Sequence, residues 1–312
     1  MNTIFFDAGA SDDERRRELY NGRLFVFSPR PSVRALCDLA RRMAEEAFAP
    51  LEPVTAQHHL PVEQYVAILA DLKPKFIHHP EAKRRIQSIL EDFNCDLNKT
   101  YFDVPRLRTA TSGNYLTSGL AYAFHPHRDT WYAAPPNQQN WWLPVYPITS
   151  ESSMAFHPRY WSEPARNSSN EYDYYEWNRT SRKEAARHIK TDTRNQPRAV
   201  EPLDLDPQIR LIMDVGGVIV FSGAHMHSTV PNTTGATRFS VDFRVVNIDD
   251  VVSKTGAPNL DTACTGTTLR DFLRGSDFER MPDEIALLYD RTTPLAGDLV
   301  FNPEVELLQK SL

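Results

Sequence analysis

The sequence predicts a mainly β fold, a β-sandwich or jelly roll with flanking helices. Within residues 1–98, apolar side chains recur at the spacing of amphipathic helices. Across residues 99–250, short stretches rich in Tyr, Trp, Val, Ile and Phe alternate with Pro, Asn, Gly and Ser, which is typical of strands separated by turns. The 312 residues include no strong linker, so we expect a single domain over residues 1–312.

Helices are expected at both ends of the chain. The N-terminal part predicts three amphipathic helices, at residues 31–48, 60–72 and 81–93. In the first of these, Val33, Leu36 and Ala40 share one face. The C-terminal helical extension, residues 251–312, predicts two short helices, at 268–274 and 282–290. They could cover the sheet or make a contact in a homo-oligomer, and the sequence leaves both open.

The β region is expected to hold several short strands and one long insertion. The clearest strands are predicted at about 119–125, 140–148, 209–214, 217–222 and 237–247. Between about residues 158 and 205 the pattern gives way to a polar, aromatic and Arg-rich segment, with one helix expected at 180–190. A connection of this length inside a compact domain is typical of a lid or of disorder, and its aromatic residues argue against disorder. The alternative to a lid is an insertion that packs elsewhere or builds an oligomer interface. Its arginines favour a polar, anionic small molecule as substrate.

Composition excludes several classes of protein. No apolar run approaches the length of a membrane span, and the N-terminus lacks the pattern of a signal peptide, so a cytoplasmic location is expected. The net charge of −6 argues against nucleic acid as a partner. The three cysteines are widely spaced without a CxxC pair, which predicts neither a disulfide framework nor a thiolate metal site.

The histidines indicate a metal site. In AFHPHRDTW, His127 and Asp129 lie two apart, and on a strand both would project from one face. His79-Pro80-Glu81 shows the equivalent spacing but has no β context. His227 follows a predicted strand and supplies a third ligand. Two histidines and one carboxylate suit iron(II) and leave three coordination positions open.

Arg238 points to a co-substrate with a carboxylate. It lies eleven residues after His227, on the next predicted strand. A guanidinium there can form paired hydrogen bonds with the far carboxylate of a bound dicarboxylate, a task for which Lys is a poor substitute.

The string FSGAHMHSTVPNTTGATR, from Phe221 to Arg238, resembles the distal half of the phytanoyl-CoA dioxygenase-like iron(II)/2-oxoglutarate oxygenases, as does His127-Arg128-Asp129. In that family a Phe precedes the second His by six residues, and a hydroxyl residue, an Asn and an Arg follow it two, five and about eleven residues later. Phe221, Thr229, Asn232 and Arg238 match these positions. The resemblance covers about residues 100–250. It implies a double-stranded β-helix, that is, a cupin-like jelly-roll barrel, with Fe(II), 2-oxoglutarate and O2.

Those spacings also select between neighbouring histidines. They fit His227 and not His225, and only His127, not His125, forms the HxD pair. For the co-substrate site, the resemblance adds Thr229 to Arg238, and Trp142 and Thr109 are weaker candidates. Seven residues are candidates for substrate contacts, with structural roles as the alternative: His125, Trp131, His157, Arg159, Tyr174, Trp177 and His225.

The activity implied is oxidation of a C–H bond in a small polar metabolite or natural-product intermediate, with release of succinate and CO2. Hydroxylation is the expected outcome, while desaturation, epoxidation and cyclisation would use the same residues. Asp129 disfavours the related halogenases, which leave that ligand position empty. The sequence departs from the family where SSMAFHPRYW replaces a Gly-rich turn, which leaves the substrate open. The alternatives are a cupin-like metal-dependent isomerase or a binding protein that does not use 2-oxoglutarate.

Overall fold

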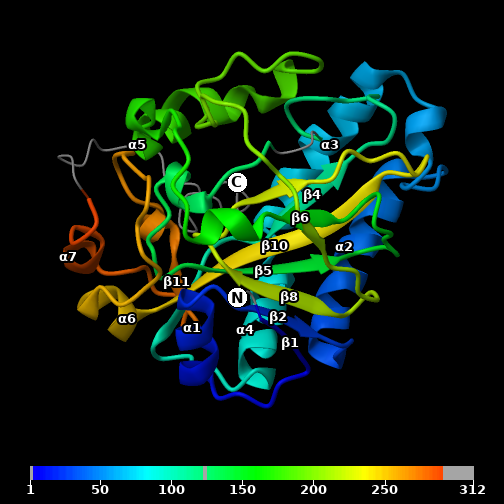
Figure 1. The fold of residues 1–312 in the computed structure, drawn as a ribbon. Coiled ribbons are helices and arrows are strands. Elements are labelled where there is room, and N and C mark those ends of the chain that lie inside the picture. The colour runs from blue at the N-terminus through cyan, green and yellow to red at the C-terminus, as the bar shows by residue number, and fades with distance from the viewer. Residues whose placement is uncertain (1–2, 122–124, 291–312) are drawn as a thin grey trace.

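The computed structural model describes residues 3–121 and 125–290, and its strands form two sheets (Figure 1). The strands of the larger sheet are β1 (Ile4–Phe6), β2 (Leu24–Phe27), β3 (Thr100–Phe102), β4 (Arg106–Ala110), β5 (Gln139–Pro144), β8 (Val218–Ser222), β10 (Arg238–Asn247) and β11 (Leu273–Arg274). Their order is β1-β2-β8-β5-β10-β3-β11, and β4 also pairs with β10. The smaller sheet has the order β7-β6-β9, from β6 (Met154–Phe156), β7 (Ile209–Arg210) and β9 (His227–Thr229).

Both faces of the larger sheet are buried, because alternate residues of each strand join different cores. In β8, Val218 and Val220 belong to a core shared with the N-terminal helices. Ile219 and Phe221 face the smaller sheet instead, where the ring of Phe221 lies 5.0 Å from that of Phe156. A sheet-rich fold with several helices is therefore confirmed. The described strands form two separate sheets rather than the closed barrel that the resemblance implied.

The helical layer is close to the prediction. Its helices are α1 (Asp12–Tyr20), α2 (Pro31–Phe48), α3 (Val62–Ile77) and α4 (Pro80–Asp92). Helix α2 has the predicted bounds, and α3 continues beyond residue 72 with Pro74 inside it. Helix α1 was not predicted, although Ser11 and Glu14 form a capping box at its start.

Two strand predictions need correction. No strand occupies 119–121 or residue 125, and residues 122–124 lie outside the described residues. Gly119 has a φ of +70°, which breaks the extended conformation that a strand requires. The prediction for 209–214 is too long, because only Ile209–Arg210 pair in β7. Leu211 and Met213 still fill the core between the sheets without joining a ladder.

The C-terminal part is less helical than predicted. It contains α6 (Ile248–Ser253), a 3-10 turn at Thr268–Asp271 that leads into β11, and α7 (Asp283–Ala286). Apolar residues of this part form a small core with Tyr101 and Val246 of the sheet. Covering the sheet is thus one of its roles, and an oligomer contact stays a prediction. None of the described helices is long and apolar enough to cross a membrane.

The insertion forms a chain of short helical turns, drawn in green at the top of Figure 1. Its turns are Pro158–Trp161, Ser169–Glu171, α5 (Tyr174–Glu176), the π-helical Trp177–Ser181 and the 3-10 turn Arg182–Arg187. The helix expected at 180–190 is therefore irregular and ends at Arg187. Tyr172, Tyr174 and Tyr175 are buried against Cys264 of the C-terminal part. A lid function for this segment stays a prediction.

Candidate metal centre

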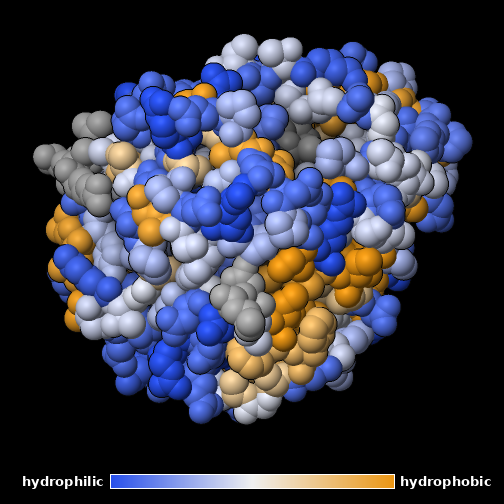
Figure 2. Space-filling view, viewed as in Figure 1, coloured by the Kyte–Doolittle hydropathy of each residue, from blue (hydrophilic) through white to orange (hydrophobic). Residues whose placement is uncertain are grey.

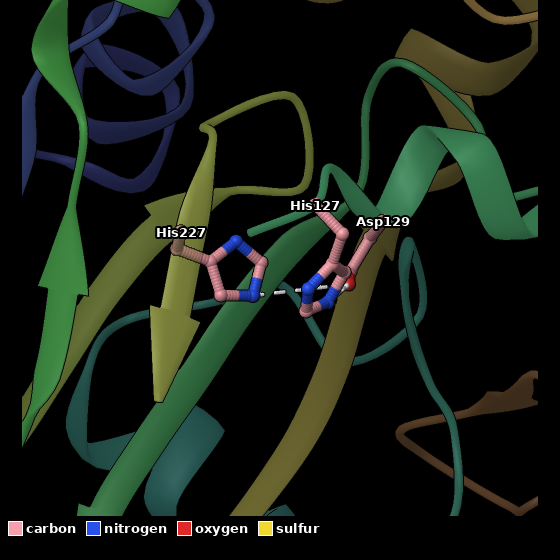
Figure 3. A group of neighbouring side chains, drawn as sticks. All are labelled: His127, Asp129 and His227. Atoms are coloured by element: carbon pink, nitrogen blue, oxygen red, sulfur yellow. Dashed lines mark ion pairs between the residues drawn. The ribbon is translucent and has the colours of Figure 1, made fainter. Parts of the chain in front are cut away.

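Three buried side chains, His127, Asp129 and His227, point toward one another (Figure 3). Nε2 of His127 lies 3.4 Å from Oδ1 of Asp129, and Nε2 of His227 lies 4.0 Å from the same oxygen. The three ligand atoms all lie within 4.8 Å of one another. Two atoms bound at a right angle to an ion, each ~2.1 Å from it, lie ~3 Å apart. A small contraction therefore brings all three onto one metal ion.

Backbone pairing holds the two histidines side by side. The amide of each donates a 3.0 Å hydrogen bond to the carbonyl of the other, and the ring centroids lie 4.4 Å apart. His227 starts β9, whereas His127 forms only this isolated bridge. Asp129 is the first residue of a 3-10 turn, Asp129–Tyr132, rather than a strand residue as expected. Its amide bonds to the carbonyl of Gly223, which joins the loop to the end of β8.

The histidine rings are oriented by the residues two positions earlier. Nδ1 of His127 lies 2.7 Å from the carbonyl of His125, and Nδ1 of His227 lies 3.0 Å from that of His225. A proton donated from each Nδ1 leaves each Nε2 as the unprotonated atom that can bind a metal. His125 and His225 thus support the ligands through their backbone. Their own side chains lie elsewhere, that of His125 in solvent and that of His225 buried near Gly22.

Side chains on the larger sheet and directly before its strand β5 fix the carboxylate of Asp129. Its Oδ2 accepts hydrogen bonds from Nε2 of Gln138 at 3.0 Å and from Nδ2 of Asn140 at 2.7 Å. Nε of Arg244 lies 3.9 Å from the same atom, and the sheet register pairs Arg244 with Asn140. Because Oδ2 is occupied in this way, Oδ1 is left facing the two histidines, as a carboxylate with one metal-binding oxygen requires.

The charges of the three groups suit a cation. Burial opposes ionisation of Asp129, but the neighbouring His127 and the charge of Arg244 hold the pKa of this carboxyl well below its usual value. Burial, together with the neighbouring His127, lowers the pKa of His227 to about 3. A carboxylate and a neutral imidazole are the forms that bind metal. This donor set of two imidazoles and one carboxylate fits iron(II).

Arg238 is a buried cation that lacks an acidic partner. It forms no ion pair with any described residue, and its Nε has no hydrogen-bond partner there. Nη1 reaches only the carbonyls of Ser152 and Ser153, at 3.3 and 3.4 Å. Burial lowers the pKa of Arg238 to about 10, so the guanidinium stays charged at neutral pH. The charge of Asp242 offsets the cost of this burial only in part, and a carboxylate ligand could pair with the guanidinium directly.

The three other co-substrate candidates differ in position. The ring centroid of Trp142 lies 5.6 Å from Cζ of Arg238, on the face toward the smaller sheet. Thr229 is two residues from His227 on β9 and therefore shares its face. Thr109 pairs with Phe239, whose side chain lies in the helix-side core. Thr109 thus faces away from Arg238, and we withdraw it from the co-substrate site.

Several proposed substrate contacts instead hold the core together. Trp131 is fully buried, and its Nε1 donates a 2.7 Å hydrogen bond to Asp261. His157 is buried, with Nε2 2.9 Å from Oγ of Ser228. Burial lowers the pKa of His225 to about 4. These positions favour the structural alternative for Trp131, His157 and His225.

The candidates in the insertion also have structural partners. Arg159 is ion-paired with Asp204 and lies 3.6 Å from Glu163. The hydroxyl of Tyr174 donates to Asp271. Trp177 is half-buried, with Cζ of Arg194 5.1 Å from its ring centroid. Tyr174 is thus buried, whereas Arg159 and Trp177 keep accessible surface.

Sequence reasoning missed the residues that support the ligands. Gln138, Asn140 and Arg244 reach Asp129 through the sheet register, which no local motif reveals. Tyr132 was also missed, and its ring lies 5.4 Å from that of His127. The aromatic pair DTWY, directly after the HxD motif, was the available signal for it. Arg128, between the two ligands, is buried and donates to Ala224 and Glu163, at 2.7 and 2.9 Å.

No protein-family model matches this chain, and no curated protein matches it in sequence. Among solved structures it is similar to ThoJ, described as a non-heme monooxygenase, with 14% identity and a TM-score of 0.38, over 82% of this chain and 85% of that one. It is similar to EvdO2 from Micromonospora carbonacea var. aurantiaca, with 16% identity and a TM-score of 0.42, over 77% and 93%. It is similar to SnoN, a non-heme alpha ketoglutarate dependent epimerase from nogalamycin biosynthesis, with 14% identity and a TM-score of 0.38, over 81% and 95%. At such distances, function has to be inferred from the side chains of the site.

Proposed function

We propose that this protein is a non-haem iron(II)- and 2-oxoglutarate-dependent oxygenase of the phytanoyl-CoA dioxygenase-like kind. Its expected reaction is hydroxylation of a C–H bond in a small polar metabolite or natural-product intermediate. The observation that carries the proposal is the buried group His127, Asp129 and His227, combined with a buried Arg238 that lacks an acidic partner. The two sheets, with His227 on β9 and His127 bridged to it, are compatible with a double-stranded β-helix scaffold.

The three metal ligands and Arg238 support different parts of the proposal, iron and 2-oxoglutarate. The two Nε2 atoms and the single free oxygen of Asp129 would hold the iron. Arg238, beside the ring of Trp142, would bind the distal carboxylate of 2-oxoglutarate. Thr229, on the face of His227, would donate its hydroxyl to the same co-substrate. With O2, iron and 2-oxoglutarate supply oxidation of a C–H bond coupled to formation of succinate and CO2.

The protein's own contribution is positioning and exclusion of water. Gln138 and Asn140 hold the carboxylate of Asp129 so that one oxygen faces the histidines. Tyr132, Phe156 and Phe221 surround the histidine rings, with centroid distances of 5.0 to 6.3 Å. An apolar, water-poor surround strengthens electrostatic contacts in the site and limits side reactions.

The test is spectroscopic and anaerobic. Iron(II) and 2-oxoglutarate added together should produce a weak visible charge-transfer band, which His127→Ala and His227→Ala abolish. His225→Ala serves as the matched control, because its side chain points away from the ligand group, and it should retain the band. On admission of O2 the wild-type protein should form succinate. A metal-binding protein that gives no band and no succinate would instead support the cupin-like alternative.

A further inference from the structure

Two of the three metal ligands lie on a loop rather than on a strand. His127 forms an isolated bridge with His227, and Asp129 begins the 3-10 turn Asp129–Tyr132. Metal ligands on a loop keep one geometry only if packing and hydrogen bonds fix the loop around them. Part of that support comes from a residue that lies outside both sheets.

Asp261, in the C-terminal part between α6 and the turn Thr268–Asp271, accepts hydrogen bonds from both sides of Asp129. Nε of Arg128 lies 3.1 Å from Oδ2 of Asp261, and Nε1 of Trp131 lies 2.7 Å from its Oδ1. Arg128 directly precedes Asp129, and Trp131 follows it by two residues. The side chains of Arg128 and Asp261 are only 3% and 5% exposed. One buried carboxylate therefore fixes the loop before and after the metal ligand.

The two side chains that Asp261 holds also contact the segment that leads to His227. Nη1 of Arg128 donates a 2.7 Å hydrogen bond to the carbonyl of Ala224. The ring of Trp131 belongs to one apolar cluster with Met226, the residue directly before His227. Arg128 and Trp131 thus connect the two segments that carry the three ligands, and a change in their position would act on both segments.

The start of the insertion is bonded to the same group. The amide of Ala165 donates a 2.9 Å hydrogen bond to Oδ2 of Asp261, and Nδ2 of Asn167 donates one of 2.9 Å to the backbone carbonyl of Asp261. Nη2 of Arg128 donates to the carbonyl of Glu163, also at 2.9 Å. The pair Arg128–Asp261 therefore joins the metal-binding loop, the insertion and the C-terminal part at one point.

Burial distinguishes this ion pair from those on the outside of the insertion. Figure 2 shows a mainly hydrophilic outer surface over the insertion, and Arg166 and Glu201 form an ion pair there with both side chains exposed. Exposed pairs contribute little, because water screens their charges. In a buried pair, loss of one partner leaves the other charge without compensation. Arg128 and Asp261 are therefore suited to fix the position of a loop, whereas the exposed pair is not.

We propose that Asp261 is a positioning residue for the metal centre, which holds the loop of His127 and Asp129 in place and ties it to the start of the insertion. The inference rests on the proposed function, because it concerns the same metal ligands. Asp261 acts through Arg128 and Trp131, so it needs no contact with the metal. Because coupling between two parts of a protein is reciprocal, metal binding should in turn restrain the insertion.

The first measurement is iron(II) binding by the full-length protein, by calorimetric titration under anaerobic conditions without 2-oxoglutarate. Asp261→Ala should weaken binding by about 10-fold, the lower end of the range for residues that orient metal ligands. Asp261→Asn should recover part of this loss, because its amide oxygen can still accept a hydrogen bond. If Asp261→Ala does not fold, Trp131→Phe replaces it, since it removes one donor to Asp261, keeps an aromatic ring and should also weaken iron(II) binding.

Asp271→Ala is the matched control. Asp271 is also buried in the C-terminal part, and it accepts the hydroxyl of Tyr174 from the insertion. This variant should lose stability in the same way but bind iron(II) with the affinity of the wild type.

The second measurement is the rate of proteolysis between residues 160 and 200, with and without iron(II). Iron(II) should slow cleavage in the wild type and in Asp271→Ala but not in Asp261→Ala, a difference that loss of stability alone does not produce. An Asp261→Ala variant that unfolds more easily yet binds iron(II) like the wild type would overturn the proposal, and equal protection in the two proteins would overturn the link to the insertion. If the wild type binds iron(II) but gives no band with 2-oxoglutarate, while Asp261→Ala binds iron(II) more weakly, the positioning role stands and the oxygenase assignment fails.

Discussion

Asn140 donates a 2.7 Å hydrogen bond to Oδ2 of Asp129. It lies on β5, eleven residues after Asp129 in the sequence. This bond, with that from Gln138, determines which carboxylate oxygen faces the histidines. Removing such a support typically costs about 10- to 100-fold in metal affinity.

We therefore expect Asn140→Ala to weaken iron(II) binding by about 10- to 100-fold, as measured by calorimetric titration under anaerobic conditions. Gln208→Ala, which changes an exposed side chain remote from the ligands, should leave the affinity unchanged. Equal affinities in wild type and Asn140→Ala would show that the histidines alone orient the metal.

Arg238→Ala should act on the co-substrate and spare the metal. Loss of a paired, charge-assisted contact in a buried site costs about 2–4 kcal/mol, so the 2-oxoglutarate concentration for half-maximal band formation should rise by roughly 30- to 1,000-fold. Arg238→Lys should recover little, because an ammonium cannot form the paired bonds. Iron binding by Arg238→Ala, measured without 2-oxoglutarate, should match that of the wild type. The control Arg210→Ala, which changes an exposed side chain, should match the wild type in both its iron binding and its 2-oxoglutarate requirement. An unaltered 2-oxoglutarate requirement in Arg238→Ala would falsify this role.

His225 predicts a loss of stability in acid for the metal-free protein. Burial lowers its pKa from 6.5 to about 4, so between these values the unfolded chain binds a proton that the folded chain does not. Stability should fall as the pH drops through this window, and this group should add no further loss below pH 4. A shift of this size corresponds to about 3 kcal/mol.

Urea unfolding of His225→Phe at several pH values tests this. The variant keeps an aromatic ring beside Phe156 and Phe221 and should lose less stability between pH 6.5 and 4 than the wild type. His227 contributes in the same direction in both proteins, so the difference isolates His225. The control His59→Phe, which changes an exposed side chain, should show the same dependence of unfolding free energy on pH as the wild type. If His225→Phe also shows the wild-type dependence, the prediction is contradicted.

Gly119 is where the insertion docks against the loop before the metal motif. A Cβ at this position would collide with the carbonyl oxygens of Ala185 and His188. The insertion is also held there by Lys190, which donates 2.6 Å bonds to the carbonyls of Asn114 and Tyr115. We therefore expect Gly119→Ala to displace the insertion, with faster proteolysis between residues 160 and 200 and more 2-oxoglutarate decay uncoupled from substrate oxidation.

Gly113→Ala is the matched control, because Gly113 also has a positive φ, +63°, but no atom lies within 4 Å of an added Cβ. Both variants carry the backbone strain, and only Gly119→Ala carries the collision. Equal rates of proteolysis in the two variants would show that docking at Gly119 does not restrain the insertion.

The sequence by itself determined the elements and residues whose signal is local. Helix α2 could be predicted with its bounds because its apolar periodicity is complete within 18 residues. The strand β10 could be predicted from alternation within the strand. His127, Asp129, His227 and Arg238 could be proposed together because their spacing along the chain matches that of the family which the sequence resembles.

Only the tertiary structure decided which side chains those residues meet. Asn140 and Arg244 reach Asp129 because β5 and β10 pair in one particular register, and a sequence does not state a register. Thr109, a candidate for the co-substrate site, faces the helix-side core for the same reason, since a shift of one residue in register reverses the face on which a strand's side chains lie.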